Sequence, residues 1–229
     1  MFDQPNIVLI ECDSMDGRVM GCVKHLAAYT PNLDQLAERG VVFRNAYCNS
    51  SQCCPSRASR WSGRHIHEIE AWNNYKGIDA DAPTYLTHLE NAGYRTQVYG
   101  KTDYVSGGHS LGARVYAWTR GAGIRLPQKK RPTESLKHIP GDVERVHERD
   151  WQHVDDSVAW LKAQSRDDEP FFLNCSFGIP HPAFVSSDWW LDKIDIDRVA
   201  LPRKPVTERH PVMDYMSATK HCEGEFDDE

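Results

Sequence analysis

Hydrophobic and polar residues alternate along this chain in blocks that predict buried strands separated by amphipathic helices. Residues 6–10 form a continuous apolar run with β-branched side chains, which is typical of a strand buried on both faces. Further strands are expected at 41–47, 96–99 and 170–176. Between the strands, helices are expected at 30–40, from just after residue 53 to 63, at 84–92 and at 150–163.

This order of elements predicts an α/β fold whose central sheet is mainly parallel and is flanked by helices. The helix at 30–40 has the clearest limits, because Thr30 can cap it, Pro31 suits its first turn and Gly40 can end it. From about residue 107 to 142, glycines, prolines and charges dominate. That stretch is expected to form loops or a lid with little helix.

The composition, with 40% hydrophobic and 26% charged residues among 229, is that of an ordinary globular protein. Its net charge of −6 disfavours general attraction to nucleic acid or to an anionic membrane. No apolar run approaches membrane-spanning length, and no signal-peptide pattern is visible, so the compartment stays open. The 7 cysteines follow neither a zinc-binding nor a disulfide-framework spacing, which fits a reduced compartment.

Several residues whose side chains could bind a ligand or take part in catalysis follow the ends of predicted strands or lie at the start of a helix. Asp13 ends the first strand, Lys101 follows a later one, and His181 lies between two prolines after the last. Taken singly, each has a structural interpretation: a turn former, a solvated lysine or a structural histidine. Because ligands bind at the carboxyl ends of the strands in open α/β sheets, we expect the three to converge there with Cys53 and Arg57. Together they could hold a divalent cation, a nucleophile and a tetrahedral anion.

The pentapeptide at 53–57, Cys-Cys-Pro-Ser-Arg, resembles the Cys-x-Pro-x-Arg signature of type I sulfatases. Residue 53 is expected just before a helix N-terminus, where amide N–H groups favour an anion, with Arg57 one turn later on the same side. The chain is thus similar to the N-terminal part of a sulfatase of the alkaline phosphatase-like superfamily. Other segments resemble that family in the same order, at 5–10 with Asp13, at 93–101 and at 180–182. Stretches closest to the arylsulfatase K type lie at 53–57, 72–77 and 148–152.

The resemblance implies an alkaline phosphatase-like sandwich whose C-terminal part is absent, with residues 1–229 forming an incomplete N-terminal catalytic domain. It also implies that a formylglycine-generating enzyme oxidises Cys53 to formylglycine. The hydrated aldehyde carries two hydroxyls on one carbon, so that one can attack sulfur and the other can later lose its proton and expel sulfate. The implied substrate is a sulfated small molecule or sugar, with no nucleic acid or membrane partner.

The resemblance further assigns roles to individual residues. Asp13 and the modified Cys53 are expected to bind Ca²⁺, and Arg57 to support the aldehyde hydrate. Lys101 and His181 are expected to act in catalysis by binding the sulfate group. Asp103 is expected to be a further substrate-binding residue. It occupies the position at which many family members have a histidine.

Two departures from the family pattern leave the expected metal site with few ligands. Ser14 stands where most sulfatases have a second aspartate, and no Asp-His-Gly segment occurs in the chain. A divalent site with so few oxygen ligands is expected to bind weakly. A sheet edge that the absent part should cover is expected to be exposed.

Three other interpretations stay open. The same superfamily contains phosphonate and phosphate monoester hydrolases, whose tetrahedral substrates differ mainly in charge. A truncated sulfatase-like domain without turnover fits the missing metal segment. A vicinal-thiol redox protein is the weakest alternative, because Cys53 and Cys54 lack the two-residue spacer of thioredoxin-like motifs.

Overall fold

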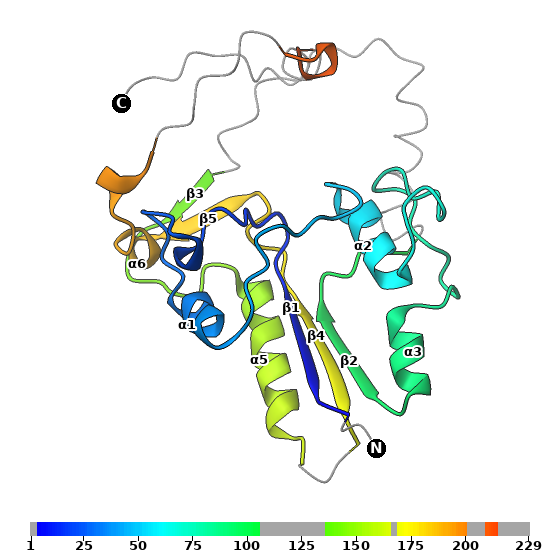
Figure 1. Cartoon of the computed structure of the whole chain (residues 1–229). Coiled ribbons are helices and arrows are strands. Elements are labelled where there is room, and N and C mark those ends of the chain that lie inside the picture. Colours follow the sequence, from blue (N-terminus) through cyan, green and yellow to red (C-terminus); the bar gives the residue numbers. More distant parts are fainter. Residues whose placement is uncertain (1–3, 106–135, 166–168, 201–208, 215–229) are drawn as a thin grey trace. The chain divides into compact units, whose positions relative to one another are not determined.

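A sheet of three parallel strands forms the centre of the fold around the candidate site (Figure 1). The computed structural model describes residues 4–105, 136–165, 169–200 and 209–214. The strand order in this sheet is β1 (Ile7–Glu11), β4 (Phe171–Ser176) and β2 (Arg95–Gly100). Both pairings, β1 with β4 and β2 with β4, are parallel. The expected α/β fold with a mainly parallel sheet is therefore confirmed.

The central strand β4 is buried along its whole length, as its apolar run predicts. Its alternate residues contact helices on opposite faces of the sheet, as the two-residue period of a strand requires. On one face, α5 (Glu148–Lys162) places Trp160 edge-on to Phe171 with ring centroids 5.1 Å apart. On the other, α3 (Tyr85–Asn91) places Tyr85 edge-on to Phe172 at 5.5 Å.

Helix α2 (Cys53–Ser62) lies on the same side as α3 and is anchored by an aromatic core. The Trp61 ring is 1% exposed and stacks on Tyr104 with centroids 4.1 Å apart. The helix ends at Gly63, whose φ of 68° is the left-handed conformation that glycine adopts without strain. It begins at Cys53 itself, so this residue lies in the first helical turn and not just before it as expected.

The described residues fall into two compact units. The first contains β1, β2, β4, α2, α3 and α5, from residues within 1–15, 42–119 and 147–181. The second contains a separate pair of parallel strands, β3 (Leu136–Ile139) and β5 (Phe184–Ser187). Its helices are α1 (Pro31–Arg39), α6 (Asp188–Leu191) and the 3₁₀ turns η1 (Gly21–Val23) and η4 (Ile196–Arg198).

The observed helices match the predicted ones with shifts of a residue or two at most ends. Pro31 begins α1, and Thr84 caps α3 in a reciprocal capping box with Thr87. The helix expected at 150–163 is α5 and begins at Glu148. None of the helices in the described ranges is both long and apolar enough to cross a membrane.

The expectation that the first strand is buried on both faces is wrong. Val8 and Ile10 are 47% and 64% exposed, whereas the alternate residues Ile7, Leu9 and Glu11 are half-buried. Val8 and Ile10 lie on the face that α5 covers, but α5 packs mainly on β4 and β2, and β1 lies at the edge of the sheet among the described residues. Its apolar sequence suits a central strand, but this structure covers only one of its faces.

The strand expected at 41–47 is also absent. These residues form no strand, and Phe43 and Tyr47 are 79% and 93% exposed. A β-branched and aromatic segment becomes a strand only where a neighbouring strand accepts its backbone hydrogen bonds. No ladder partner for 41–47 exists in the part of the chain that the structure describes.

The predicted loop region at 107–142 lies mostly outside the described residues, which resume at 136. In the described part, residues 136–139 form β3, where a loop was expected. The parallel pairing with β5 explains this difference, since β5 supplies the backbone partners that local sequence cannot reveal.

Candidate active site at the carboxyl ends of the strands

Asp13 lies two residues beyond β1 and is the centre of a charged cluster, although it is only 5% exposed. Its Oδ2 atom is 2.6 Å from Lys101 Nζ and 3.3 Å from Arg57 Nη2. Its Oδ1 atom accepts hydrogen bonds from the Ser14 hydroxyl at 2.8 Å and from the Cys53 thiol at 3.6 Å. Burial alone would raise the pKa of Asp13, but the Lys101 and Ser14 hydrogen bonds and the two cations lower this pKa to about 2. The carboxylate is therefore ionised at neutral pH.

Arg57 joins three elements through a guanidinium that is almost fully buried. Its Nη1 donates to the backbone carbonyl of Lys101 at 2.7 Å and to the Ser176 hydroxyl at 3.0 Å, while Nη2 contacts Asp13. These bonds tie α2 to the ends of β1, β2 and β4. The Arg57 guanidinium thus donates its hydrogen bonds to protein groups, as expected of a residue that fixes the geometry of the site.

Lys101 is placed by the residue before it. Gly100 has a φ of 90°, and a Cβ atom there would lie 1.8 Å from the Ser176 carbonyl oxygen, so only glycine fits. The same carbonyl accepts the backbone N–H of Lys101 at 3.0 Å. Burial tends to lower the pKa of Lys101, but the hydrogen bond and charge of Asp13 raise it above its ordinary value. The ammonium group also donates to the Cys53 sulfur at 3.8 Å.

Cys53 and Cys54 are neighbours in sequence with different surroundings. Cys53 is half-buried and its thiol contacts Asp13 and Lys101, whereas Cys54 is buried and only 2% exposed. Burial raises the pKa of Cys53, and the charge of Asp13 adds to this effect, although Lys101 opposes it. Burial raises the pKa of Cys54 further, to about 11. Both side chains are therefore thiols at neutral pH, and only Cys53 faces the cluster.

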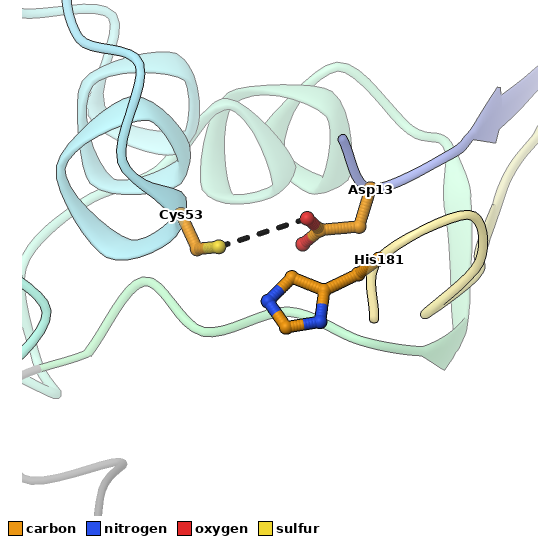
Figure 2. A group of neighbouring side chains, drawn as sticks. All are labelled: Asp13, Cys53 and His181. Carbon is orange, nitrogen blue, oxygen red and sulfur yellow. Dashed lines mark hydrogen bonds between the residues drawn. The ribbon is translucent and has the colours of Figure 1, made fainter. Parts of the chain in front are cut away.

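His181 completes the group of potential ligands. Figure 2 shows its imidazole ring beside the Asp13 carboxylate and the Cys53 thiol, with the three side chains pointing toward one another. One ligand atom from each of these residues lies within 4.8 Å of the other two. The histidine comes from the loop after β4, and the Asp13 backbone N–H donates to the Ile179 carbonyl in that loop at 3.0 Å.

Asp103 lies next to this cluster. Its carboxylate is 3.6 Å from Lys101 Nζ, and its backbone has a positive φ of 39°. The structure therefore brings all of the sequence-predicted site residues together, namely Asp13, Cys53, Arg57, Lys101, Asp103 and His181.

Two residues that shape the site through distant contacts, Ser176 and Asn74, were not predicted from the sequence. Ser176 accepts from Arg57 across 119 positions of sequence, and its place at the end of β4 was the available signal. Asn74 accepts the backbone N–H of Cys54 at 3.1 Å and so satisfies one free amide at the start of α2. No local signal identifies Asn74, because it acts from a loop 20 residues away.

The donor atoms present fit part of a divalent-cation site. Asp13 supplies an ionised, buried carboxylate of the kind that Ca²⁺ prefers, and an oxygen in place of the Cys53 sulfur would supply a second hard ligand. Ca²⁺ takes about 6–8 oxygen ligands in proteins. The described residues alone therefore provide an incomplete set, in which Lys101 and Arg57 balance the charge of Asp13.

The profile of the family described as Sulfatase matches residues 5–195. Arylsulfatase K of Homo sapiens is 41% identical over 97% of this chain, which corresponds to 44% of the human protein. A solved structure of a 2-O GAG sulfatase is 29% identical, with a TM-score of 0.56 over 78% of this chain and 36% of that one.

The fold is shared more widely than the sequence. The phosphonate monoester hydrolase of Agrobacterium radiobacter has a TM-score of 0.61 over 82% of this chain at 22% identity, which shows likeness of fold alone. In each of these comparisons, the chain spans less than half of the length of the protein it matches.

Proposed function

Because the chain belongs to the sulfatase family, we propose that it corresponds to the N-terminal catalytic part of a sulfuric ester hydrolase whose nucleophile is made from Cys53. One observation supports this most directly: the Cys53 sulfur lies 3.6 Å from the ionised carboxylate of Asp13 and 3.8 Å from the ammonium group of Lys101. A sulfate ester bound there would meet a nucleophile and cationic groups at one edge of the sheet.

The nucleophile in this proposal is formylglycine at position 53. As a hydrated aldehyde, this group offers one hydroxyl that can attack sulfur and a second that can lose its proton and expel sulfate. The unmodified thiol is a poor alternative, because burial raises the pKa of Cys53 and keeps the sulfur protonated. Cys54 is a poor candidate for this role, because it is only 2% exposed and burial raises the pKa of its thiol to about 11.

The side chains around Cys53 have different proposed roles in binding the substrate. Lys101 is 23% exposed at its side chain, so its ammonium can reach a sulfate oxygen while it remains near Asp13. The His181 ring lies beside Cys53 and can donate a hydrogen bond to the same sulfate group. Arg57 holds these groups in place through its hydrogen bonds to the Lys101 carbonyl and to the Asp13 carboxylate. Asp103 is proposed to contact the substrate beside Lys101.

Asp13 and the modified residue 53 are proposed to hold Ca²⁺. The ion would neutralise negative charge on the sulfate group. Binding by the described residues alone should be weak, because the remaining oxygen ligands of a typical calcium site are missing from them. The substrate class is proposed to be a sulfated sugar, which is supported by the likeness to a 2-O GAG sulfatase.

The first test is chemical. The chain is produced together with a formylglycine-generating enzyme, and the peptide that contains residues 53 and 54 is examined by mass spectrometry and by reaction with a hydrazide probe. We expect loss of the Cys53 thiol and gain of aldehyde reactivity, with no such change in the Cys53→Ala variant. A cysteine that stays unmodified at position 53 in every preparation would contradict the proposal.

The second test separates the reaction classes. Hydrolysis of nitrophenyl sulfate is compared with that of nitrophenyl phosphate by the modified protein, with and without Ca²⁺. Preference for the sulfate supports the proposal, whereas preference for the phosphate identifies a phosphate or phosphonate monoester hydrolase. Full modification without turnover of either ester identifies a non-catalytic sulfatase-like domain.

A further inference from the structure

We propose that Asp150, which neither the motif nor the charged cluster includes, is a positioning residue that holds the loop carrying His181 against the candidate site. The proposal depends on the proposed function only for the role of His181 in binding sulfate. Asp150 lies in the first turn of α5, on the far side of the loop from Asp13.

Both oxygens of the Asp150 carboxylate are used on two consecutive backbone amides. Oδ1 accepts the N–H of Gly178 at 3.0 Å, and Oδ2 accepts the N–H of Ile179 at 2.9 Å. Hydrogen bonds to a charged acceptor are roughly twice as strong as bonds between neutral groups. This pair of bonds therefore fixes both the position and the orientation of the loop just before Pro180 and His181.

The two bonds to Asp150 hold the chain just beyond the end of the sheet, where the backbone bonds between strands stop. The central strand, β4, stops at Ser176, and the Phe177 N–H still donates to the Glu11 carbonyl at 2.9 Å. From Gly178 onward the loop leaves the sheet, and its next two amides bond to Asp150. Without Asp150, those two N–H groups would lose their acceptor in a region that is only partly open to water.

The same loop is bonded to Asp13 from the other side. The Ile179 carbonyl accepts the Asp13 backbone N–H at 3.0 Å, and the His181 N–H donates to the Gly178 carbonyl at 3.1 Å. Ile179 is therefore held at its N–H by α5 and at its carbonyl by the residue after β1. Through this one residue, Asp150 sets where His181 stands relative to Asp13.

A different interpretation is that Asp150 only stabilises α5, because a negative charge in the first turn favours the helix dipole. Glu148 tests this alternative, since it occupies the same first turn, is exposed, and is not bonded to the loop. Asp150→Asn removes the charge and replaces one acceptor oxygen by an NH₂ group, which would face an N–H of the loop. Glu148→Gln removes an equivalent charge without touching the loop.

The experiment uses NMR on the full chain, with the imidazole Cε1–Hε1 signal of His181 and a titration with inorganic sulfate as readouts. We expect Asp150→Asn to shift the His181 signal and to weaken sulfate binding by about tenfold, as the loss of one charge-assisted hydrogen bond allows. We expect Glu148→Gln to change neither readout. In a His181→Ala background, Asp150→Asn should cause no further loss of sulfate affinity, whereas a purely structural role would lower the affinity in both backgrounds.

Amide hydrogen exchange gives an independent measurement, whose first part uses only the unmutated chain. The Gly178 and Ile179 amides should exchange slowly, and Asp150→Asn should accelerate them by at least about tenfold while Phe177 stays unchanged. Fast exchange of both amides in the unmutated chain overturns the proposal, as does an unchanged His181 signal in Asp150→Asn. If the unmutated chain fails to bind sulfate, the proposed sulfate site is wrong, and the His181 signal and the exchange rates still decide the role of Asp150.

Discussion

Replacement of Gly100 by alanine should damage both the stability of the sheet and the position of Lys101. Gly100 ends β2 opposite Ser176 of β4, and it has a φ of 90°. A Cβ atom at this position would lie 1.8 Å from the Ser176 carbonyl oxygen, a backbone atom that cannot swing aside. Gly93 offers a matched control, because its φ of 88° is almost the same and a Cβ atom added there would have no neighbour within 4 Å.

The two substitutions share one cost and differ in another. A left-handed backbone costs an L-residue about 1–2 kcal/mol, and this applies at both positions. Forcing a methyl group into a packed site adds about 1–3 kcal/mol, which applies only at Gly100. We therefore expect Gly100→Ala to lower the free energy of unfolding by about 2 kcal/mol more than Gly93→Ala. The alanine must also displace the carbonyl that accepts the Lys101 N–H, so sulfate binding should weaken only in Gly100→Ala.

Urea unfolding followed by tryptophan fluorescence measures the difference. With a slope of about 2 kcal/mol per molar urea, the extra cost corresponds to a midpoint about 1 M lower for Gly100→Ala than for Gly93→Ala. Equal midpoints for the two variants would refute the reasoning, because the backbone strain alone would then account for both. An unchanged affinity for sulfate in Gly100→Ala would refute the link between this glycine and Lys101.

Two further predictions follow from the acidity of groups in the site. The pKa of Asp13 is lowered from 3.8 to about 2, so its ionised form should contribute about 2 kcal/mol to stability above pH 4, and this contribution should disappear as the pH falls to about 2. The stability difference between the unmutated chain and Asp13→Asn, measured by urea unfolding from pH 6 to pH 2, should therefore shrink across that range; a constant difference would contradict the assignment. The unmodified thiols should react with iodoacetamide in the order Cys48, Cys53, Cys54, because Cys48 is exposed and burial raises the pKa of Cys54 to about 11. Mass spectrometry after brief labelling checks this order, and early labelling of Cys54 would show that α2 opens readily.

The elements of the fold that depend on local sequence were predictable. Pro31, Thr84 and Gly63 mark helix ends through backbone preferences that act within a few residues. The apolar run of β4 predicts a strand covered on both faces, and the structure shows it at the centre of the sheet. The meeting of Asp13 and Lys101 followed from one rule, that parallel strands deliver their carboxyl ends to the same edge.

What escaped prediction depends on partners that are distant in sequence. The segment 41–47 has a strand-forming sequence, but a strand needs a neighbour, and periodicity says nothing about whether one is present. The bonds of Asp150 to the loop before His181 span 28 and 29 positions, and an aspartate in a first helical turn already has a sufficient local explanation. Ser176 and Asn74 likewise act on α2 from other elements.

The free side of β1 has a practical consequence for work with this chain in solution. Within the described ranges of the chain, no strand pairs with this side of β1, and the aliphatic side chains of Val8 and Ile10 are exposed on the same strand. An edge of this kind is a template on which other extended polypeptides can grow, including further copies of the same molecule. Self-association should therefore rise with concentration, and a polypeptide that lends a strand to this edge would act as a solubilising cap.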